Sequence, residues 1–296
     1  PAPGPSPPPP RGAGREPPPP RFPHPPPHPR RGGAARAGAA AGARLVVLPE
    51  AASAGYMFTD RADARRNAEP VPDGPVCSAW AALAAELDLW IVAGVTELAG
   101  EKVYNAAVLM GPEGHVGTFR KAHLWNFEKE LYDRQEDGFP VFRTPLGNIG
   151  IGICYDAWFP ETFRSAALGG ADLLALPSNW VPVPGQPEDA PVMANLMCMT
   201  AAHSNQFFVA GVSRTGSERD QGFIGRSLIV GPDGWPLAGP AGGDEEAIVL
   251  AEVDLIGSRK ERLGNPFNQP LGDRRTDVYR TGDFTPDSSD LTGNTA

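Results

Sequence analysis

The chain contains little cysteine and no long apolar segment, and these absences exclude several classes of protein. Three cysteines in 296 residues are too few for a disulfide framework. No run of eighteen apolar residues occurs, so no transmembrane helix is expected. The first residues also lack a basic stretch followed by an apolar one, so no secretory signal is expected. We therefore expect a reduced, cytoplasmic protein with no membrane partner.

The net charge is negative but unevenly distributed. Residues 1–44 hold seven Arg and one Glu, a net of +6, so the remainder must carry -15 to reach the total of -9. An acidic body argues against nucleic acid as the main partner. Apolar residues make up 41% of the chain, which is enough for a substantial core.

The first thirty residues contain sixteen prolines. Proline lacks a backbone N–H, so it is excluded from helix interiors and from central strands. Few apolar side chains are present to offset the ordering entropy, so we expect residues 1–33 to form a disordered leader. A proline-rich ligand for an aromatic groove and a transit peptide are the functional alternatives. Residues 282–296 are expected to form a polar C-terminal tail.

From Arg44 onward, apolar runs separated by turn signals predict alternating strands and helices. We predict strands or hairpins over residues 44–49, 90–95, 103–120, 141–153, 171–176, 206–212, 228–238 and 247–254. Helices are predicted over residues 75–87 and 191–203, from residue 160, and just after residue 254. This alternation favours an α/β fold with mixed sheets covered by helices.

Three polar residues each follow a predicted strand, where chemistry collects in α/β sheets. Glu50 follows the first strand, Lys121 follows the hairpin over 103–120, and Cys154 lies between a predicted strand and a predicted helix. Taken one at a time, a solvated turn carboxylate, a surface lysine and a core thiol are the ordinary interpretations. Taken together, they form a nucleophile, a base and a cation that stabilises an anionic intermediate.

The motifs around these residues resemble the carbon–nitrogen hydrolase (nitrilase) superfamily. The matching segments are Leu45-Val-Val-Leu-Pro-Glu50 with Gly55-Tyr56, Arg120-Lys-Ala-His-Leu124, Gly150-Ile-Gly-Ile-Cys-Tyr-Asp-Ala-Trp-Phe-Pro-Glu161, Gly225-Arg-Ser-Leu-Ile-Val-Gly-Pro-Asp-Gly234 and Asp273-Arg-Arg-Thr-Asp-Val-Tyr279. They occur in the family's order, and the likeness covers roughly residues 36–281. We therefore assign residues 34–281 to one hydrolase domain.

The resemblance implies a four-layer α-β-β-α sandwich of two mixed sheets, whose subunits pair into a homodimer or higher homo-oligomer. It also implies that Glu50 is the base, Lys121 the stabiliser of the intermediate and Cys154 the nucleophile that forms a thioester. Glu128 would help to position the substrate and Lys121, and the Tyr155 N–H would lie in the oxyanion hole.

The sequence departs from the family at its start. The family opens with a core strand and a long helix before the glutamate motif, whereas here only Ala34 to Ala43 could be the end of that helix. The first strand is absent or replaced by the proline-rich segment.

Other polar residues show no pattern that would hold a metal or a cofactor, and we expect neither. His115, His123 and His203 lack metal-ligand spacing. Cys198 lies in an apolar stretch of a predicted helix, and Cys77 is expected to be buried as well.

The residues after the nucleophile bear on the substrate. Family nitrilases usually have Cys-Trp-Glu here, whereas Cys154-Tyr-Asp156 looks more like the amidase and carbamoyl-amide branches. We therefore expect hydrolysis of a small linear amide, with an N-carbamoyl amine such as N-carbamoylputrescine, or a nitrile, as alternatives. The expected substrate-binding residues are Tyr56, Trp125, Asn179 and Trp180. A catalytically silent scaffold subunit is the non-enzyme alternative.

Overall fold

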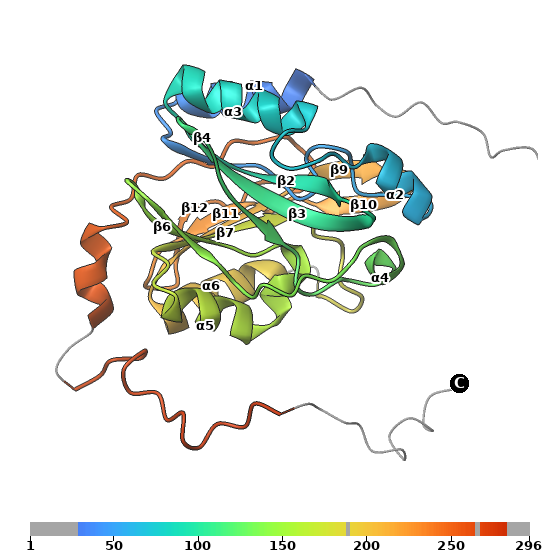
Figure 1. Ribbon diagram of the computed structural model, residues 1–296. Coiled ribbons are helices and arrows are strands. Elements are labelled where there is room, and N and C mark those ends of the chain that lie inside the picture. Colours follow the sequence, from blue (N-terminus) through green and yellow to red (C-terminus); the bar gives the residue numbers. More distant parts are fainter. Residues whose placement is uncertain (1–28, 188–189, 264–266, 283–296) are drawn as a thin grey trace, which may run out of the picture.

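The chain folds into two β-sheets that stack face to face between two layers of helices (Figure 1). The computed structural model describes residues 29–187, 190–263 and 267–282. The four-layer α-β-β-α sandwich expected from the sequence is confirmed. Within the described residues, no helix has the length and apolar character needed to cross a membrane.

The first sheet, here called sheet A, has the strand order β1-β2-β3-β4. Its strands are β1 (Leu45–Val47), β2 (Trp90–Ala99), β3 (Lys102–Gly111) and β4 (Gly114–Arg120). Strand β1 runs parallel to β2, and the next two pairs are antiparallel. Since each antiparallel step reverses direction, β1 and β4 point the same way and their carboxyl ends lie at one end of the sheet.

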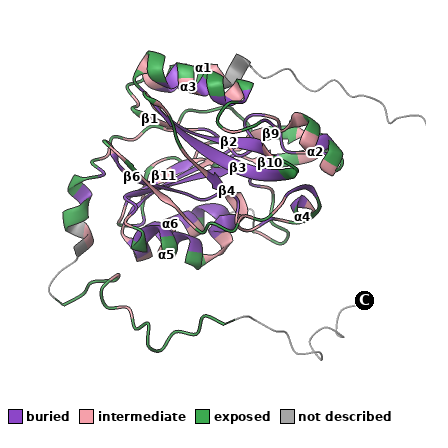
Figure 2. Cartoon of the chain, in the orientation of Figure 1, coloured by how far each residue is buried: buried purple, intermediate pink, exposed green. Residues whose placement is uncertain are grey.

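Helices α1 (Pro29–Ala40) and α3 (Pro75–Leu87) cover the outer face of sheet A (Figure 1). Helix α3 begins with proline at its first position, where the missing N–H costs nothing. It buries Cys77, Trp80 and Leu83 against the sheet, at the spacing of one helix face. Figure 2 shows the long strands of sheet A as buried along most of their length.

The second sheet, here called sheet B, has the order β12-β11-β8-β7-β6-β5. Its strands are β5 (Val141–Thr144), β6 (Gly147–Ile151), β7 (Leu173–Ser178), β8 (Phe208–Ser213), β11 (Leu228–Val230) and β12 (Pro236–Ala238). The central strands β6, β7 and β8 are parallel, and α5 (Pro160–Leu168) and α6 (Met193–Asn205) cover their outer face. Parallel strands covered on both faces are apolar throughout, as in β7.

The inner faces of the two sheets share one apolar cluster. Val92 and Leu109 of sheet A pack with Ile151 and Ala175 of sheet B, and all four are at most 1% exposed. This close-packed layer fixes the strand ends of one sheet relative to those of the other.

Short elements surround the ends of the strands. They are α2 (Arg61–Asn67), α4 (Glu128–Leu131), the hairpin of β9 (Thr215–Glu218) and β10 (Gln221–Ile224), and the 3₁₀ helices η1 (Cys154–Trp158) and η2 (Gly257–Leu263). Strands β9 and β10 were not predicted, because their residues are mostly polar or glycine.

Two expectations about element boundaries were wrong. Helix α1 begins at Pro29, inside the range 1–33 expected to be disordered. Proline is tolerated in a first helical turn, and the helix is held by buried Ala35 and by the Arg36–Glu86 ion pair. Residues 1–28 of that leader, and residues 283–296 of the expected tail, lie outside the described residues.

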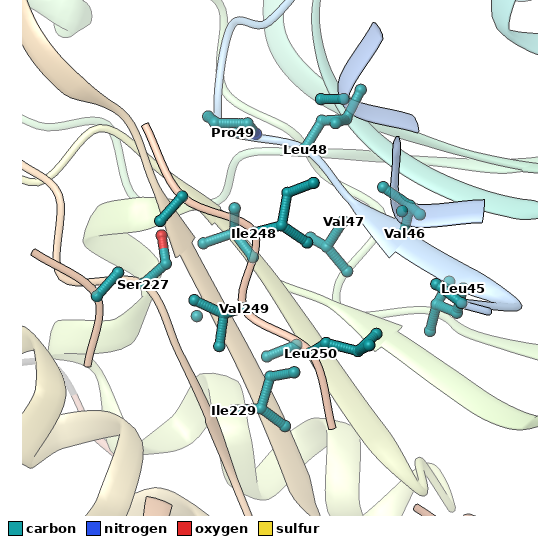
Figure 3. A pocket seen from close by; sticks show the side chains of 18 of the residues that line it. Leu45, Val46, Val47, Leu48, Pro49, Ser227, Ile229, Ile248, Val249 and Leu250 are labelled. Carbon is teal, nitrogen blue, oxygen red and sulfur yellow. The ribbon is translucent and has the colours of Figure 1, made fainter. Parts of the chain in front are cut away.

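The second error is the strand predicted over residues 247–254. This segment carries no strand assignment, although its side chains alternate in exposure between Leu250 and Val253. It lies along a cleft of about 1840 Å³ that it forms with α1, β1 and β11. Figure 3 shows the side chains of β1 facing the segment from Ile248 to Leu250, with Ile229 on the neighbouring strand β11.

The pattern of the segment is that of a strand, but none of the described residues pairs with it in a ladder. Strand β1 has the complementary feature, since within the described part of the chain it pairs with β2 alone. The cleft therefore separates two extended segments that each have an open edge. Neither Lys121 nor Cys154 lines it, so we do not assign it as the catalytic pocket.

Candidate active site

The three candidate catalytic residues come together beyond the ends of three strands. Glu50 follows β1, Lys121 directly follows β4, and Cys154 opens η1 just after β6. The common direction of β1 and β4 places the first two side by side, and the stacking of sheet B on sheet A adds the third. The grouping expected from the sequence is thus what the fold produces.

Lys121 lies between two carboxylates in the interior. Its Nζ donates to Glu50 Oε1 at 2.7 Å and to Glu128 Oε1 at 2.8 Å. The three side chains are at most 1% exposed. Three buried charges are unfavourable unless they are paired and hydrogen-bonded, and here each carboxylate meets the ammonium directly.

Two neighbours complete the hydrogen bonding of these carboxylates. Asn105 of β3 donates from Nδ2 to Oε1 of Glu50 at 2.8 Å and to Oε1 of Glu128 at 3.2 Å. The Trp125 N–H donates to Glu128 Oε2 at 2.7 Å. Within the described residues, Glu50 Oε2 is buried and has no hydrogen-bond partner.

Burial and the neighbouring charges shift the pKa of each group. Burial raises the pKa of Glu50, and Glu128 raises it further while Lys121 opposes both. Burial alone would lower the pKa of Lys121, but Glu128 and Glu50 raise it well above its usual value. Lys121 is therefore a permanent cation, whereas Glu50 is a stronger base than an exposed glutamate.

Cys154 is half-buried and lies on a sharp turn between strand and helix. Its backbone has a positive φ of 46°, a conformation that a residue with a side chain rarely adopts. Burial, with a smaller contribution from Glu50, raises the pKa of its thiol well above the usual value, and Lys121 opposes this rise. The group is therefore a neutral thiol at rest that needs a base when it reacts.

Asp156 holds this turn in place. Its Oδ2 accepts the Ile153 N–H at 2.9 Å, next to the cysteine, and its Oδ1 accepts the His123 N–H at 2.9 Å. The ring Nδ1 of His123 lies 2.7 Å from the same oxygen, and the ring stacks on Phe159 at a centroid distance of 3.6 Å. One buried carboxylate thus joins the cysteine turn to the loop that carries Lys121.

The expected substrate-binding residues differ in position. The Tyr56 ring packs edge to face on Phe223, and burial together with Glu128 and Glu50 raises the pKa of its phenol far above the usual value, so the hydroxyl lies near the carboxylates. Asn179 Nδ2 donates to the Glu50 carbonyl at 3.1 Å, and its own N–H bonds to the Cys154 sulfur.

The remaining candidates are Trp125, in the loop that carries Glu128, Tyr155, next to the nucleophile, and Trp180, in the core. Trp125 is half-buried and starts the turn that carries Glu128. The ring of Tyr155 lies against Trp158 and Phe159. Trp180 is 2% exposed and packs in the apolar cluster between sheet B and α6, which favours a structural role.

The other two cysteines are remote from this arrangement. Cys77 belongs to α3 and packs in the apolar cluster between that helix and sheet A. Burial raises the pKa of its thiol above the usual range. Burial also raises the pKa of Cys198, in α6, to about 12. In the described ranges, no group of three or more His, Cys, Asp or Glu side chains could hold a metal ion.

Three residues of this site escaped the sequence reasoning. Asn105 lies inside a strand of apolar residues, and a polar residue at a core position was the one available signal. The sequence presents Asp156 only as part of the motif after the nucleophile, and His123 only as a histidine without metal-ligand spacing.

Comparison with known proteins gives a consistent result. A family model described as carbon–nitrogen hydrolase matches residues 32–261. The chain is 37% identical over 238 residues to a nitrilase from Pyrococcus abyssi, covering 80% of this chain and 87% of that protein. It is 35% identical to the 2-oxoglutaramate amidase of Bacillus subtilis, covering 80% and 87%. It is 30% identical to the N-carbamoylputrescine amidase of Solanum lycopersicum, covering 81% and 83%.

A solved structure supports the same assignment. The crystal structure of a carbon–nitrogen hydrolase from Helicobacter pylori G27 matches with a TM-score of 0.74 and 26% sequence identity. The match covers 84% of this chain and 90% of that chain.

Proposed function

Because this chain belongs to the carbon–nitrogen hydrolase family and is an enzyme that acts on carbon–nitrogen bonds, we propose that it hydrolyses a small linear amide through a thioester on Cys154. The observation that carries the proposal is the buried cluster of Glu50, Lys121 and Glu128 at the strained turn of Cys154. It supplies a base, a fixed cation and a nucleophile at one place.

In the first half of the reaction, Glu50 takes the proton of the Cys154 thiol as sulfur attacks the amide carbonyl carbon. The carbonyl oxygen becomes an oxyanion, which the Lys121 ammonium and the Tyr155 N–H stabilise. Collapse of this intermediate returns the proton from Glu50 to nitrogen and releases ammonia. The acyl group remains on sulfur as a thioester.

In the second half, water attacks the thioester. Glu50 removes a proton from the water, and the oxyanion forms again beside Lys121. Collapse then breaks the carbon–sulfur bond, releases the carboxylic acid and returns the proton to sulfur. Glu128 holds Lys121 throughout, because its Oε1 accepts an Nζ–H while its Oε2 accepts the Trp125 N–H.

A small linear amide is favoured over the two alternative substrates by the residues that follow the nucleophile. Tyr155 and Asp156 stand where nitrilases of the family usually have Trp and Glu. A relative named 2-oxoglutaramate amidase supports this choice. Relatives named N-carbamoylputrescine amidase and nitrilase keep the N-carbamoyl amine and the nitrile as second and third candidates.

The same family supports pairing of subunits through the helices of sheet B. Large apolar side chains are exposed there on α5 and α6, namely Leu168, Met193 and Leu196. We propose a homodimer across this face, and light scattering of the purified chain measures its mass.

A substrate panel tests the proposed reaction. Ammonia release is measured from linear primary amides, N-carbamoyl amines and nitriles, with Cys154→Ala as the inactive control. We expect release from amides and the matching carboxylic acid as co-product. An N-carbamoyl amine would yield ammonia together with the free amine and carbon dioxide.

Labelling with iodoacetamide distinguishes an enzyme from a silent scaffold. We expect Cys154 to react faster than Cys77 and Cys198, which are buried in apolar clusters. Equal, slow labelling of all three thiols together with no ammonia from any compound would contradict the proposal.

A further inference from the structure

Asn105 occupies a position that the fold alone does not explain. It lies inside β3, opposite Thr96 of β2, and is 2% exposed. Its strand neighbours Ala106 and Val108 are fully buried apolar residues. Asparagine is disfavoured in strands, and a buried amide is costly unless its hydrogen bonds are made.

Both side-chain hydrogen bonds of Asn105, and one of its backbone, lead to the candidate active site, while its amide oxygen has no partner among the described residues. Its Nδ2 donates to Oε1 of Glu50 and of Glu128, and its backbone carbonyl accepts the Lys121 N–H at 2.8 Å. The amide must present its nitrogen to these carboxylates, because its oxygen could only repel them. One strand residue therefore bonds to both buried carboxylates and to the backbone of the lysine between them.

The two carboxylates differ in how their oxygens are used. Oε1 of each accepts from both Asn105 and Lys121. The second oxygen of Glu128 accepts the Trp125 N–H. The second oxygen of Glu50 has no partner in the described part of the chain. Among these four oxygens, Glu50 Oε2 is thus the one left free to take up a proton.

We propose that Asn105 is a positioning residue, which fixes the Glu50 carboxylate so that Oε2 receives the thiol proton of Cys154. This inference rests on the proposed function. In the step concerned, the S–H bond breaks, the proton moves to Oε2, and the electron pair left on sulfur forms the bond to the carbonyl carbon. Asn105 acts through Glu50 and not on the substrate.

A neutral donor suits this position. A second cation in place of the amide would favour the ionised form of Glu50 strongly and weaken it as a base. The amide adds a directional bond without adding charge. It also leaves one N–H of the Lys121 ammonium uncommitted, since the two carboxylates use the other two.

Substitutions at Asn105 test the inference, with a second buried amide as a matched control. Asn105→Leu removes the donor at similar size, and Asn105→Asp keeps the shape but adds a carboxylate. The control is Asn205→Leu, since Asn205 is 3% exposed and donates to a carbonyl within α6. For each variant we measure kcat, KM, the melting temperature and the rate of Cys154 alkylation by iodoacetamide against pH.

The dependence of the Cys154 alkylation rate on pH reports the protonation state of Glu50, whose titratable neighbours are known. The titratable groups facing it are Lys121, Glu128, Cys154, Tyr56 and Tyr132. The variants leave all five of these side chains in place, and Glu50 is the group proposed to take the thiol proton. A change in the acid limb, which is the fall of the alkylation rate at low pH, is therefore assigned to Glu50. Loss of a donor, or a third carboxylate, raises the pKa of Glu50 and moves this limb to higher pH.

We expect both Asn105 variants to lose about 10- to 100-fold in kcat, with KM little changed and the acid limb shifted upward. Asn205→Leu should keep the kcat and the limb of the original protein even where its melting temperature falls. Asn105→Leu with the original kcat and limb would overturn the inference. Equal losses in Asn105→Leu and Asn205→Leu that follow only the melting temperature would overturn it too.

The two proposals fail separately. Alkylation needs no substrate, so the shift of its acid limb is measurable even if no compound of the panel is hydrolysed. A shifted limb without turnover would uphold the positioning of Glu50 and contradict the proposed reaction. If Asn105→Leu does not fold, the isosteric Asn105→Asp variant decides by the same two readouts.

Discussion

Filling the cleft beside β1 with one added strand should stabilise the protein. Helix α1 leads directly into β1, whose outer edge is open. A strand placed just before α1 would return beside β1 through a right-handed β-α-β crossover, the usual hand for such connections. The variant replaces residues 1–28 by six residues with alternate apolar side chains, followed by a short turn into Pro29.

The structure gives the size of the effect. Ile248 and Leu250 on the cleft wall are 54% and 48% exposed, so covering each gains about 1 kcal/mol. Three inward side chains of the new strand gain about 2 kcal/mol each, and five ladder hydrogen bonds about 1 kcal/mol each. The gain of about 13 kcal/mol exceeds the roughly 10 kcal/mol needed to order six residues. A net 3 kcal/mol corresponds to about 6–12 °C in melting temperature for a domain of this size.

Thermal melts of three proteins decide the matter. They are the original chain, the variant with the apolar strand, and a control of equal length with Lys and Glu at the inward positions. The control keeps the backbone donors but cannot fill the cleft, so its midpoint should stay near that of the original. Equal midpoints for the apolar and charged strands would refute the reasoning, because they would show that the cleft gains nothing from an apolar occupant.

Three further predictions concern single residues. Cys154→Ala should abolish ammonia release with an unchanged melting temperature, and Cys154→Ser should retain less than about a tenth of the activity, because Glu50 is too weak a base for a hydroxyl. Lys121→Arg should be inactive in the same assay although it keeps the charge, since a planar guanidinium cannot replace a compact ammonium; near-normal turnover would remove Lys121 from the site. Burial alone would raise the pKa of Asp172, but its hydrogen bond to Arg259 lowers it below 3.8. Asp172→Asn should therefore cost about 2–3 kcal/mol at neutral pH, because it removes the charge that pairs with half-exposed Arg259 and with the more buried Arg262. Melts should show the difference vanish as the pH falls through the lowered folded-state pKa of Asp172.

Much of the fold could be predicted because its signals are local. Helix α3 matches its predicted bounds, and the turns of the three expected hairpins lie where the glycines and prolines indicate. The strand expected over residues 247–254 failed for a non-local reason. Its alternation is that of a strand, but a strand exists only with a hydrogen-bonded neighbour, and the sequence of the segment holds no information on that neighbour.

The residues of the site also divide into those that the local sequence reveals and those that depend on contacts between distant segments. Glu50, Lys121 and Cys154 were found from their places after strands, which is a property of the local sequence. Asn105 was not found, because its role depends on its contacts with Glu50 and Glu128, which are distant from it in the sequence. The Asp156 contact with His123 likewise joins segments far apart in the chain, so no spacing rule could reveal it.

Three departures from low-energy choices meet at the candidate active site. Three charges are buried, Glu50 Oε2 lacks a partner within the described residues, and Cys154 takes a positive φ. None of these stabilises a fold, since an apolar replacement of a buried ion pair is often neutral or favourable. Positive φ values and unpartnered buried atoms also occur elsewhere in the described chain, as at Gln206, but at the candidate site they meet three buried charges. Local costs that gather at one place, held there by Asn105 and Asp156, mark a site maintained for its chemistry and not for stability.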